Sequence, residues 1–478
     1  MAHPLTAGIV STAWQPSSVD ETRHDQEHYH HRTHAIELET IWGTVRSKLT
    51  HPMTVTSAPA TEGHFLLTIN GGSSSIKFGA FDRCGPLRRI LHGEMTGIGS
   101  PHANLKVNGA SQTEKVSRDA NAPDHAAAVG VIMDYIDGRF SPGRLTAIGH
   151  RVVHGGPKYS APVRITPDVI MELREVGAYD PEHMPEEIEL IEALGHRFPS
   201  VPQIACFDTA FHHDMPRVAR TLPIPRRYEA QGLRRFGFHG LSYEYLVGEI
   251  SRVAGPDPAQ GRMILAHLGS GASLAAVHAG KSIDTSMGLT PAAGVPMSTR
   301  SGDLDPGLGG YLFRSERMTP AQFNKMANFE SGLLGISETS SDMRVLIASE
   351  TSDERAADAV ALFCYQTRKW IGAFAAALGG LETLVFAGGI GENSPIIRAR
   401  ICNKLGFLGI KLCVAQNENS AAVISQEGRP VTVRVIATDE QRMIARHVIT
   451  FLNGASELPP AEQCPTQNQQ RGSDGAAN

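Results

Sequence analysis

The chain has 478 residues, of which 41% are hydrophobic and 19% charged, and its formal net charge is -5 at pH 7. This composition is typical of a globular protein, and the slight acidic excess excludes a surface built to neutralise a nucleic-acid backbone. No apolar run reaches the length of about 18 residues that a membrane span needs. The six cysteines are scattered without a C-x-x-C pair, as in buried thiols of a reducing compartment, so we expect a cytoplasmic protein.

Both ends of the sequence are polar. Residues 1–62 contain the cluster HDQEHYHHRTH, and residues 455–478 are rich in Pro, Gln and Gly. Such compositions predict a disordered His-rich extension and a disordered tail. Metal binding is the alternative for the His cluster, although it lacks ligands at fixed spacing. Strand patterns begin only at His64, so Met53 is a second candidate for the natural start.

Between these ends, short β-branched or apolar runs alternate with helical patterns, as in α/β proteins. The length predicts at least two packed domains. The predicted strands are 65–69, 76–81, 147–153, 203–207, 263–268, 273–278, 383–386 and 431–435. The predicted helices are 124–136, 185–198, 242–253, 320–329, 353–377 and 439–451.

Two stretches repeat one pattern of strand, Gly/Ser turn and strand, namely LLTINGGSSSIKFGAF and MILAHLGSGASLAAVHAGK. A hairpin turn needs only about two residues, so the surplus of small donors in the first stretch suits an anion such as phosphate. These donors are the amides near Gly71 and Gly72, the hydroxyls of Ser73 and Ser75 and the ammonium of Lys77. The repeat predicts a duplicated fold with facing phosphate loops.

A third glycine-rich loop, in LVFAGGIGENSPIIRARI, follows a strand and opens a helix. Gly388, Gly389 and Gly391 would free the backbone to approach a ligand, with Asn393 or Ser394 as the helix N-cap. Amides at a helix start attract phosphate or sugar oxygens. A plain strand-to-helix turn is the alternative.

Two arginines occur in glycine-rich settings. Arg151 ends an apolar strand in GHRVVHGG, and Arg300 lies in the small-residue loop MSTRSGDLDPG. Guanidinium groups in such positions suit a planar anion such as a carboxylate or a transferring phosphoryl group. A structural role is the alternative for each arginine taken alone.

Three further polar residues occupy positions that favour ligand contact. His239 lies between glycines just before a helix in FGFHGLS, and Asp208 follows a buried strand in ACFDTAFH. Carboxylates at strand ends often meet ligands in α/β folds. Glu440 begins the last helix, next to Asp439, and a helix-capping acid is the alternative there.

In chain order the motifs are INGGSSSIKF, GHRVVHGG, FDTAFH, FGFHG, HLGSGAS, DTSMGLTP, TRSGDLDPG, SGLLGISETSSDMR, FAGGIGEN and TDE. This ordered set resembles the acetate kinase family over about residues 65–452, and that family belongs to the acetate and sugar kinase, Hsp70 and actin superfamily. The resemblance implies an α/β fold of duplicated ribonuclease H-like (actin-like ATPase) domains with a nucleotide cleft between them. The implied domains are 63–209 with 441–454, and 210–440.

The resemblance also implies the activity. The enzyme would transfer the γ-phosphate of ATP to acetate reversibly, with Mg²⁺ or alternatively Mn²⁺, giving acetyl phosphate and ADP. The acetate carboxylate is already a charged nucleophile, so the protein has to neutralise charge repulsion and align the reactants by direct in-line transfer. The implied partners are ATP/ADP, a short-chain carboxylate and a second copy of the chain in a homodimer, without nucleic acid or membrane.

The resemblance implies a role for each residue that matches a family motif, and these roles are expectations. The catalytic residues would be Arg151, Asp208, His239 and Arg300, and the metal would be held by Asn70 and Glu440. The substrate would contact Arg151, Val153 and Pro291. ATP would contact Ser73, Ser75, Lys77, His267, Gly269, Ser270, Gly271, Asp342, Met343, Arg344, Gly388, Gly389, Ile390, Gly391 and Asn393.

The sequence departs from the family pattern at several positions. Glu182 replaces a leucine of the acyl pocket, and a carboxylate beside an acetate methyl would be costly. Its alternatives are rotation to solvent or pairing with Arg174 or His183. Tyr243 replaces a histidine of the pattern H-G-T-S-H. Other replacements are Met184 for asparagine, Ser270 for asparagine, Ser298 for glycine and Gly71 for cysteine.

Two other functions compete with acetate kinase. Propionate or butyrate kinase keeps the chemistry and changes the acid. A chaperone-like nucleotide switch would need a peptide-binding domain after the ATPase core, whereas only a short tail follows Leu452. A sugar kinase would give no reason for two anion-seeking arginines.

Overall fold

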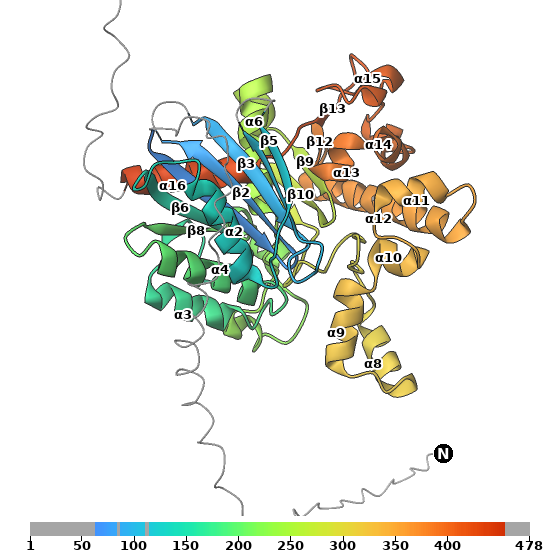
Figure 1. The fold of residues 1–478 in the computed structure, drawn as a ribbon. Helices are drawn as coiled ribbons and strands as arrows, with labels where there is room; N and C mark the ends of the chain where they lie inside the picture. Colours follow the sequence, from blue (N-terminus) through green and yellow to red (C-terminus); the bar gives the residue numbers. More distant parts are fainter. Residues whose placement is uncertain (1–62, 84–86, 110–113, 455–478) are drawn as a thin grey trace, which may run out of the picture. The chain divides into compact units, whose positions relative to one another are not determined.

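The structure is a computed structural model that describes residues 63–83, 87–109 and 114–454 (Figure 1). The predicted His-rich extension and C-terminal tail lie outside the described residues. Within these ranges, no helix has the length and apolar character to cross a membrane. The cysteines in the described part of the chain are free, and they are Cys206, Cys364, Cys402 and Cys413.

The first sheet has eight strands in the order β5-β4-β3-β2-β1-β6-β8-β7. Strand β1 pairs antiparallel with β2 and parallel with β6, which pairs parallel with β8. The strands are β1 (Phe65–Gly72), β2 (Ser75–Asp82), β3 (Arg89–Thr96), β4 (Asn104–Gly109), β5 (Lys115–Asp119), β6 (Leu145–Val152), β7 (Val163–Arg164) and β8 (Gln203–Phe207).

The second sheet has five strands in the order β11-β10-β9-β12-β13. They are β9 (Met263–Leu268), β10 (Ala272–His278), β11 (Lys281–Thr285), β12 (Thr383–Ala387) and β13 (Thr432–Val435). Strand β9 pairs antiparallel with β10 and parallel with β12, which pairs parallel with β13. This pairing repeats that of β3-β2-β1-β6-β8, so the sequence repeat is a repeat of topology.

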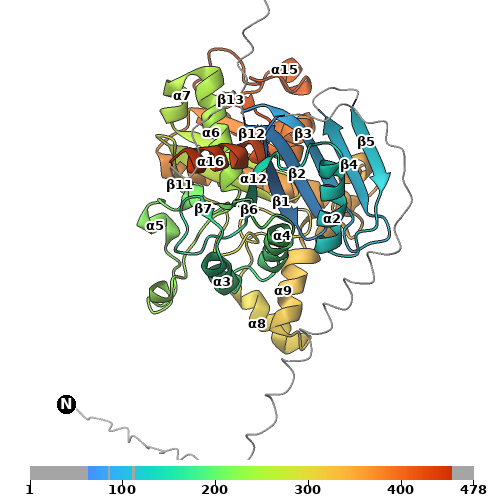
Figure 2. The same ribbon diagram turned by 60° about the vertical axis from the view of Figure 1, so that its left-hand side comes forward.

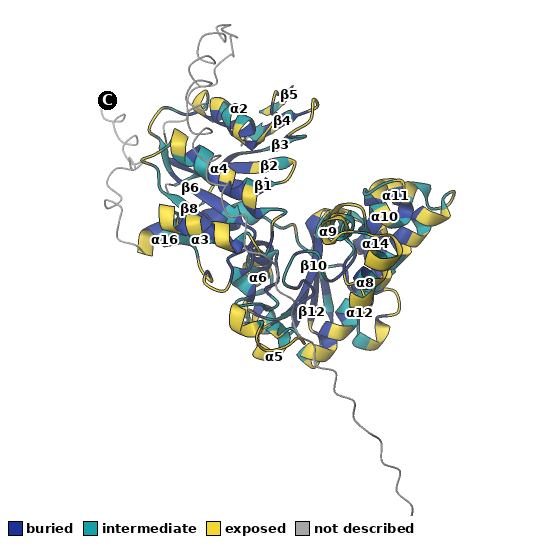
Figure 3. Cartoon of the chain, turned by 90° about the horizontal axis from the view of Figure 1, so that it is seen from below, coloured by how far each residue is buried: buried dark blue, intermediate teal, exposed yellow. Residues whose placement is uncertain are grey.

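Helices cover both faces of the first sheet (Figures 1 and 2). Helices α2 (His125–Asp137) and α4 (Met184–Arg197) pack together on one face, whereas α16 (Glu440–Gly454) packs against β1 and β6 on the other. Helix α6 (Gly240–Ala254) lies against α16, and α12 (Glu354–Leu378) packs against β9 and β10. Figure 3 shows that the strands are mostly buried and that exposed residues gather on the helices.

The remaining helices are mostly short. They are α3 (Pro167–Val176), η1 (Ala210–His212), α5 (Arg217–Arg220), η2 (Glu229–Gln231), α7 (Pro256–Gln260), α8 (Pro306–Ser315), α9 (Pro320–Phe329), α10 (Gly332–Ser337), α11 (Met343–Ser349), α13 (Gly388–Asn393), α14 (Pro395–Cys402), η3 (Gly406–Leu408) and α15 (Val414–Glu418).

Side-chain alternation along the central strands builds the core. Phe65 and Leu67 of β1 pack in a cluster with α2 and α4, whereas Leu66 joins a cluster with α6 and α16. That second cluster also contains Met263 and Leu265 of β9. Because successive strand residues face opposite sides of a sheet, α6 and α16 share one core with both sheets.

Every strand and helix predicted from the sequence is present, with ends that differ by a few residues. Two details of the glycine loops are wrong. Gly71 and Gly72 lie inside β1, not in the turn, and a Cβ at Gly71 would lie 2.3 Å from Leu190 Cδ1 of α4. The run from Gly388, predicted as a loop, is itself the short helix α13. The predicted N-cap of the next helix is confirmed at Ser394, one of its two candidates.

Candidate active site

Three turns at the ends of β1, β9 and β12 form the floor of the site. Ser73 and Ser74 make the two-residue turn between β1 and β2. In the turn after β9, the amide of Gly269 donates to the carbonyl of Gly271 at 2.9 Å. A Cβ at Gly271 would lie 3.2 Å from His239 Nε2, so the missing side chain permits this close approach.

The turn after β12 is locked in place by its own helix. Gly388 has φ of 76°, and a Cβ there would lie 2.7 Å from the carbonyl oxygen of Leu268. The carboxylate of Glu392 accepts hydrogen bonds from the amides of Gly388 at 2.8 Å and Thr438 at 3.1 Å. No atom lies within 4 Å of a Cβ placed on Gly389, which leaves this backbone open toward a ligand.

A cavity of about 770 Å³ lies over these turns. Its volume is in the range of small-molecule sites. The nucleotide residues predicted from the sequence that line it are Ser73, Gly269, Ser270, Gly271, Asp342, Met343, Arg344, Gly389, Ile390 and Asn393. The predicted residues His267 and Gly388 line an adjoining cavity of about 870 Å³. Gly391 lines neither, because it packs against Phe386.

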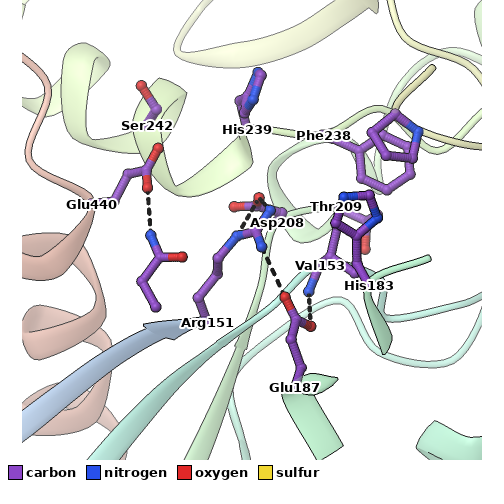
Figure 4. Close-up of polar contacts among 12 residues, drawn as sticks. Arg151, Val153, His183, Glu187, Asp208, Thr209, Phe238, His239, Ser242 and Glu440 are labelled. Atoms are coloured by element: carbon purple, nitrogen blue, oxygen red, sulfur yellow. Dashed lines mark hydrogen bonds and ion pairs between the residues drawn. The ribbon is translucent and has the colours of Figure 1, made fainter. Parts of the chain in front are cut away.

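Arg151, at the end of β6, is held by two buried carboxylates (Figure 4). Its Nε and Nη2 donate to Asp208 Oδ2 at 2.9 and 2.7 Å, and its Nη1 donates to Glu187 Oε1 at 2.8 Å. The other oxygen of Glu187 accepts from the amide of Val153 at 2.8 Å. Three of the five guanidinium N–H groups are thus used, which leaves two for an incoming anion.

Burial governs the ionisation of this cluster. Burial raises the pKa of Glu187 to about 8, although Arg151 and the Val153 amide oppose the shift. Burial also raises the pKa of Asp208, again against the effect of Arg151. Burial disfavours the charge of Arg151, but Asp208 and Glu187 outweigh it and raise the pKa of Arg151 above its usual value. Arg151 therefore stays a cation beside two carboxyl groups that burial makes easier to protonate.

His239 is held in a strained backbone conformation with φ of 59°. Its Nδ1 is hydrogen-bonded to Ser273 Oγ at 2.8 Å, and its ring stacks on His267 with centroids 4.3 Å apart. Burial, followed by His267, Arg151 and Arg300, lowers the pKa of His239 well below its ordinary value. The imidazole is therefore neutral, and strain of this kind tends to persist at functional positions.

A smaller pocket of about 330 Å³ adjoins the nucleotide cavity. Among its lining residues are Ser75 and Lys77, the cations Arg151 and Arg300, and His239. Its apolar walls come from Val153, Phe238 and Pro291. Arg300 Nη1 donates to the carbonyl of Pro291 at 3.1 Å, and burial lowers the pKa of Arg300.

The predicted metal residues lie side by side on the edge of this pocket. Asn70 Nδ2 donates to Glu440 Oε2 at 2.8 Å, and Glu440 acts electrostatically on Asp208. Asp208 Oδ1 is buried without a hydrogen-bond partner. These oxygens suit a hard divalent cation, which prefers carboxylate and amide oxygens. In the described part of the chain, no three His, Cys, Asp or Glu side chains form a ready-made metal cluster.

The expectation that Glu182 faces the acyl pocket is wrong. Its Oε1 accepts from Asn324 Nδ2 of α9 at 2.6 Å, and His183, not Glu182, lines the pocket. The two alternative partners are also engaged elsewhere. Arg174 pairs with Glu192 at 2.7 Å, and His183 pairs with Asp180 at 2.9 Å.

Glu187 is the site residue that sequence reasoning missed. It lies on the buried face of α4 with Met184, Ile188 and Ile191, and only 4% of its surface is exposed. An acidic side chain at helical spacing within an apolar stripe was the signal that could have found it, because a buried carboxylate needs a partner. Asp208 is likewise buried, with Oδ2 bonded to Arg151 and Oδ1 without a hydrogen-bond partner.

Comparisons with known proteins identify the family. A model of the acetokinase family matches residues 65–446. The chain is 44% identical over 403 residues to the acetate kinase of Rhodopseudomonas palustris (strain ATCC BAA-98 / CGA009), covering 81% of this chain and 98% of that relative. It is 40% identical over 404 residues to the propionate kinase of Citrobacter rodentium (strain ICC168), covering 83% and 99%. The crystal structure of Porphyromonas gingivalis acetate kinase matches with a TM-score of 0.74 at 37% identity, covering 82% of this chain and 100% of that chain. The predicted fold of duplicated actin-like domains is therefore confirmed, and the chain belongs to the acetokinase family.

Proposed function

We propose that this protein is an acetate kinase, which transfers the γ-phosphate of ATP reversibly to acetate. One observation carries the proposal: the nucleotide cavity of about 770 Å³ and the small cationic pocket share five lining residues, which are Ser73, Ser74, Ser270, Gly271 and Arg300. A nucleotide in the first and a small carboxylate in the second would therefore meet at these five residues. The shared edge contains backbone amides, hydroxyls and a guanidinium, which suit a phosphoryl group.

The residues around this shared edge would have different roles in phosphoryl transfer. Arg151, fixed by Asp208 and Glu187, would present its two remaining N–H groups to the incoming carboxylate or phosphoryl oxygens. Arg300 and His239 approach Gly271 from one side and would donate to the phosphoryl group in flight. No general base is needed, because the acetate oxygen attacks as an anion.

The divalent cation, proposed as Mg²⁺ with Mn²⁺ as the alternative, would neutralise phosphate charge when bound. Asn70 and Glu440 would hold it, with Asp208 supplying a free carboxylate oxygen nearby. Asp208 would also help to position the substrate, because it is bonded to Arg151.

Acetate is the substrate that the small pocket supports best. Val153 and Pro291 offer apolar surface to a methyl group, and Glu182 does not line the pocket, because its carboxylate bonds to Asn324 of α9. The similarity to a propionate kinase keeps propionate as the second candidate. The relative kcat/KM for acetate and propionate distinguishes these two substrates.

Three finer features belong to the proposal. The domains would be residues 63–209 with 441–454, and 210–440, which is supported by the division of strands between the two sheets. A homodimer is supported by the exposed apolar side chains Val218 and Ile224, and light scattering would test it. A cytoplasmic location is supported by the free thiols.

The test is a panel of two- to four-carbon carboxylates with ATP and Mg²⁺, in which hydroxylamine traps the acyl phosphate as a hydroxamate. We expect hydroxamate from acetate at the highest kcat/KM, less from propionate and little from butyrate. Hydrolysis of ATP without hydroxamate from any acid would refute the proposal. A higher kcat/KM for propionate than for acetate would replace acetate by propionate.

A further inference from the structure

Behind His239, on the side away from the pocket, lies a chain of buried hydroxyl groups. Ser273 Oγ lies between His239 Nδ1, at 2.8 Å, and the phenol oxygen of Tyr243, with which it forms a short hydrogen bond. Tyr243 and Ser273 are both fully buried.

The donors and acceptors of this chain can be assigned from the need to satisfy every buried proton. Since His239 is neutral, it has one N–H, on Nδ1 or on Nε2. If Nδ1 carried the proton, it would donate to Ser273, whose hydroxyl could then either donate to Tyr243 or accept from the phenol as well. In the first case the phenol proton, and in the second case the serine proton, would be buried without an acceptor among the described residues, which is unfavourable.

The opposite arrangement satisfies every group. Tyr243 donates to Ser273, Ser273 donates to His239 Nδ1, and the proton of His239 is on Nε2. Burial raises the pKa of Tyr243, so the phenol stays protonated and remains a donor at neutral pH. Nε2 faces the turn at Gly271, where the large cavity meets the small pocket.

We propose that Tyr243 and Ser273 are positioning residues that form a directed hydrogen-bond relay, fixing His239 as the Nε2–H tautomer so that it donates toward the transferring phosphoryl group. The choice of tautomer matters because the bond to one ring nitrogen decides what the other nitrogen can do. With a bare Nε2, the imidazole would present a lone pair to the phosphoryl oxygens and repel them. The inference rests on the proposed function only for its kinetic part.

The relay assigns a role to a departure from the family pattern. The resemblance places a histidine where this chain has Tyr243, and a histidine could donate or accept according to its own tautomer and charge. A phenol that stays protonated has an O–H to donate to Ser273, and it cannot change tautomer. The tyrosine thus favours the direction of the relay that leaves Nδ1 of His239 as the acceptor.

The test begins with the unliganded full-length protein labelled with ¹⁵N-histidine. Imidazole ¹⁵N shifts distinguish a protonated from a bare nitrogen, and loss of the signals in His239→Asn assigns them. We expect a bare Nδ1 and a protonated Nε2 in the wild type, and a tautomer mixture in Tyr243→Phe and Ser273→Ala. A protonated Nδ1 in the wild type, or an unchanged tautomer in both variants, would overturn the relay.

Kinetics supply the second measurement. We expect kcat to fall about 10-fold to about 100-fold in Tyr243→Phe and Ser273→Ala, as for other residues that orient a functional imidazole, with little change in either KM. Ser273→Thr keeps the hydroxyl and should restore most of the activity. Tyr159→Phe is the matched control, because it removes a phenol that bonds to Glu172 and does not line the pocket.

The outcomes separate the relay from a packing role and from the proposed function. A shifted tautomer with unchanged kcat would refute positioning, and a lower kcat with an unchanged tautomer would indicate packing alone. If Tyr243→Phe does not fold, Ser273→Ala and Ser273→Thr decide the question. If the wild type formed no acyl phosphate, the proposed function would be refuted. The ¹⁵N measurement would still test the relay, because it does not depend on activity.

Discussion

Glu187 provides the sharpest test of how the site is held together. In Glu187→Gln, the amide oxygen can still accept one hydrogen bond, but the NH₂ group must face either Arg151 Nη1 or the Val153 amide, both donors. One of these two hydrogen bonds is therefore lost. Where it is the bond from Arg151, a charge-assisted hydrogen bond of about 1.5–3 kcal/mol is removed from the three that fix the guanidinium. If all of this free energy is lost from the stabilisation of the transition state, kcat/KM for acetate falls about 10-fold to about 100-fold.

The loss of kcat/KM in Glu187→Gln should increase as the pH rises. Because the pKa of Glu187 is raised to about 8 by burial, the carboxyl is protonated at lower pH, and a protonated carboxyl resembles the glutamine amide. Above that pKa the wild type has the carboxylate that accepts from both donors, and the variant does not. The ratio of wild-type to variant kcat/KM should therefore be close to one near pH 6 and should rise to its full value near pH 9.

The assay is hydroxamate formation from acetate across this pH range, with Glu192→Gln as the control. Glu192 lies on the same helix and pairs with Arg174 at 2.7 Å, but the pair is solvent-exposed. Such surface pairs contribute little, so Glu192→Gln should change kcat/KM by less than about two-fold at every pH. If Glu187→Gln behaved like this control at pH 9, Glu187 would not hold Arg151. A deficit that did not vary with pH would refute the raised pKa.

Three further predictions follow from the same contacts. Arg300→Ala should lower kcat at least about 100-fold with an unchanged thermal unfolding midpoint, whereas Arg151→Ala should lower both, because it leaves two buried carboxylates unpaired; equal melting temperatures would contradict this difference. Glu182→Leu should leave KM for acetate and propionate unchanged, since its carboxylate bonds to Asn324, and a lower KM for acetate would return Glu182 to the pocket. Chelation of divalent cations should abolish acyl phosphate formation and Mg²⁺ should restore it, while full activity in chelator would remove the metal from the mechanism.

The sequence predicted the elements whose periodicity is long and clear. The stripe of α12 and the apolar runs of β9 and β12 are examples, because each is buried along most of one face or on both faces. It did not predict β5 (KVSRD), whose residues are mostly exposed, or α8 (PGLGGYLFRS), which contains three glycines. Helix α3 could have been predicted from the sequence, because Thr166 caps it and Pro167 begins it.

For the site, the sequence located residues that lie in glycine-rich turns, because a turn that exposes backbone has a local signature. Residues that act through a partner distant in sequence had no such signature. Glu187 meets Arg151 across 36 positions, and Glu182 meets Asn324 across 142. These pairs are set by how α4 packs against β6 and how α9 approaches the loop before α4, which no single stretch of sequence encodes.

The two arginines that the sequence treated as equivalent are held in different ways. Arg151 has two carboxylate partners, so its position is fixed and much of its charge is already balanced before a ligand arrives. Arg300 bonds only to the carbonyl of Pro291 and the sulfur of Met297 among the described residues, and burial lowers its pKa. A buried cation with only neutral partners gains most from an entering anion. Arg300 is therefore the residue whose charge a bound phosphoryl or carboxylate group would chiefly balance, while Arg151 sets the direction from which that group is approached.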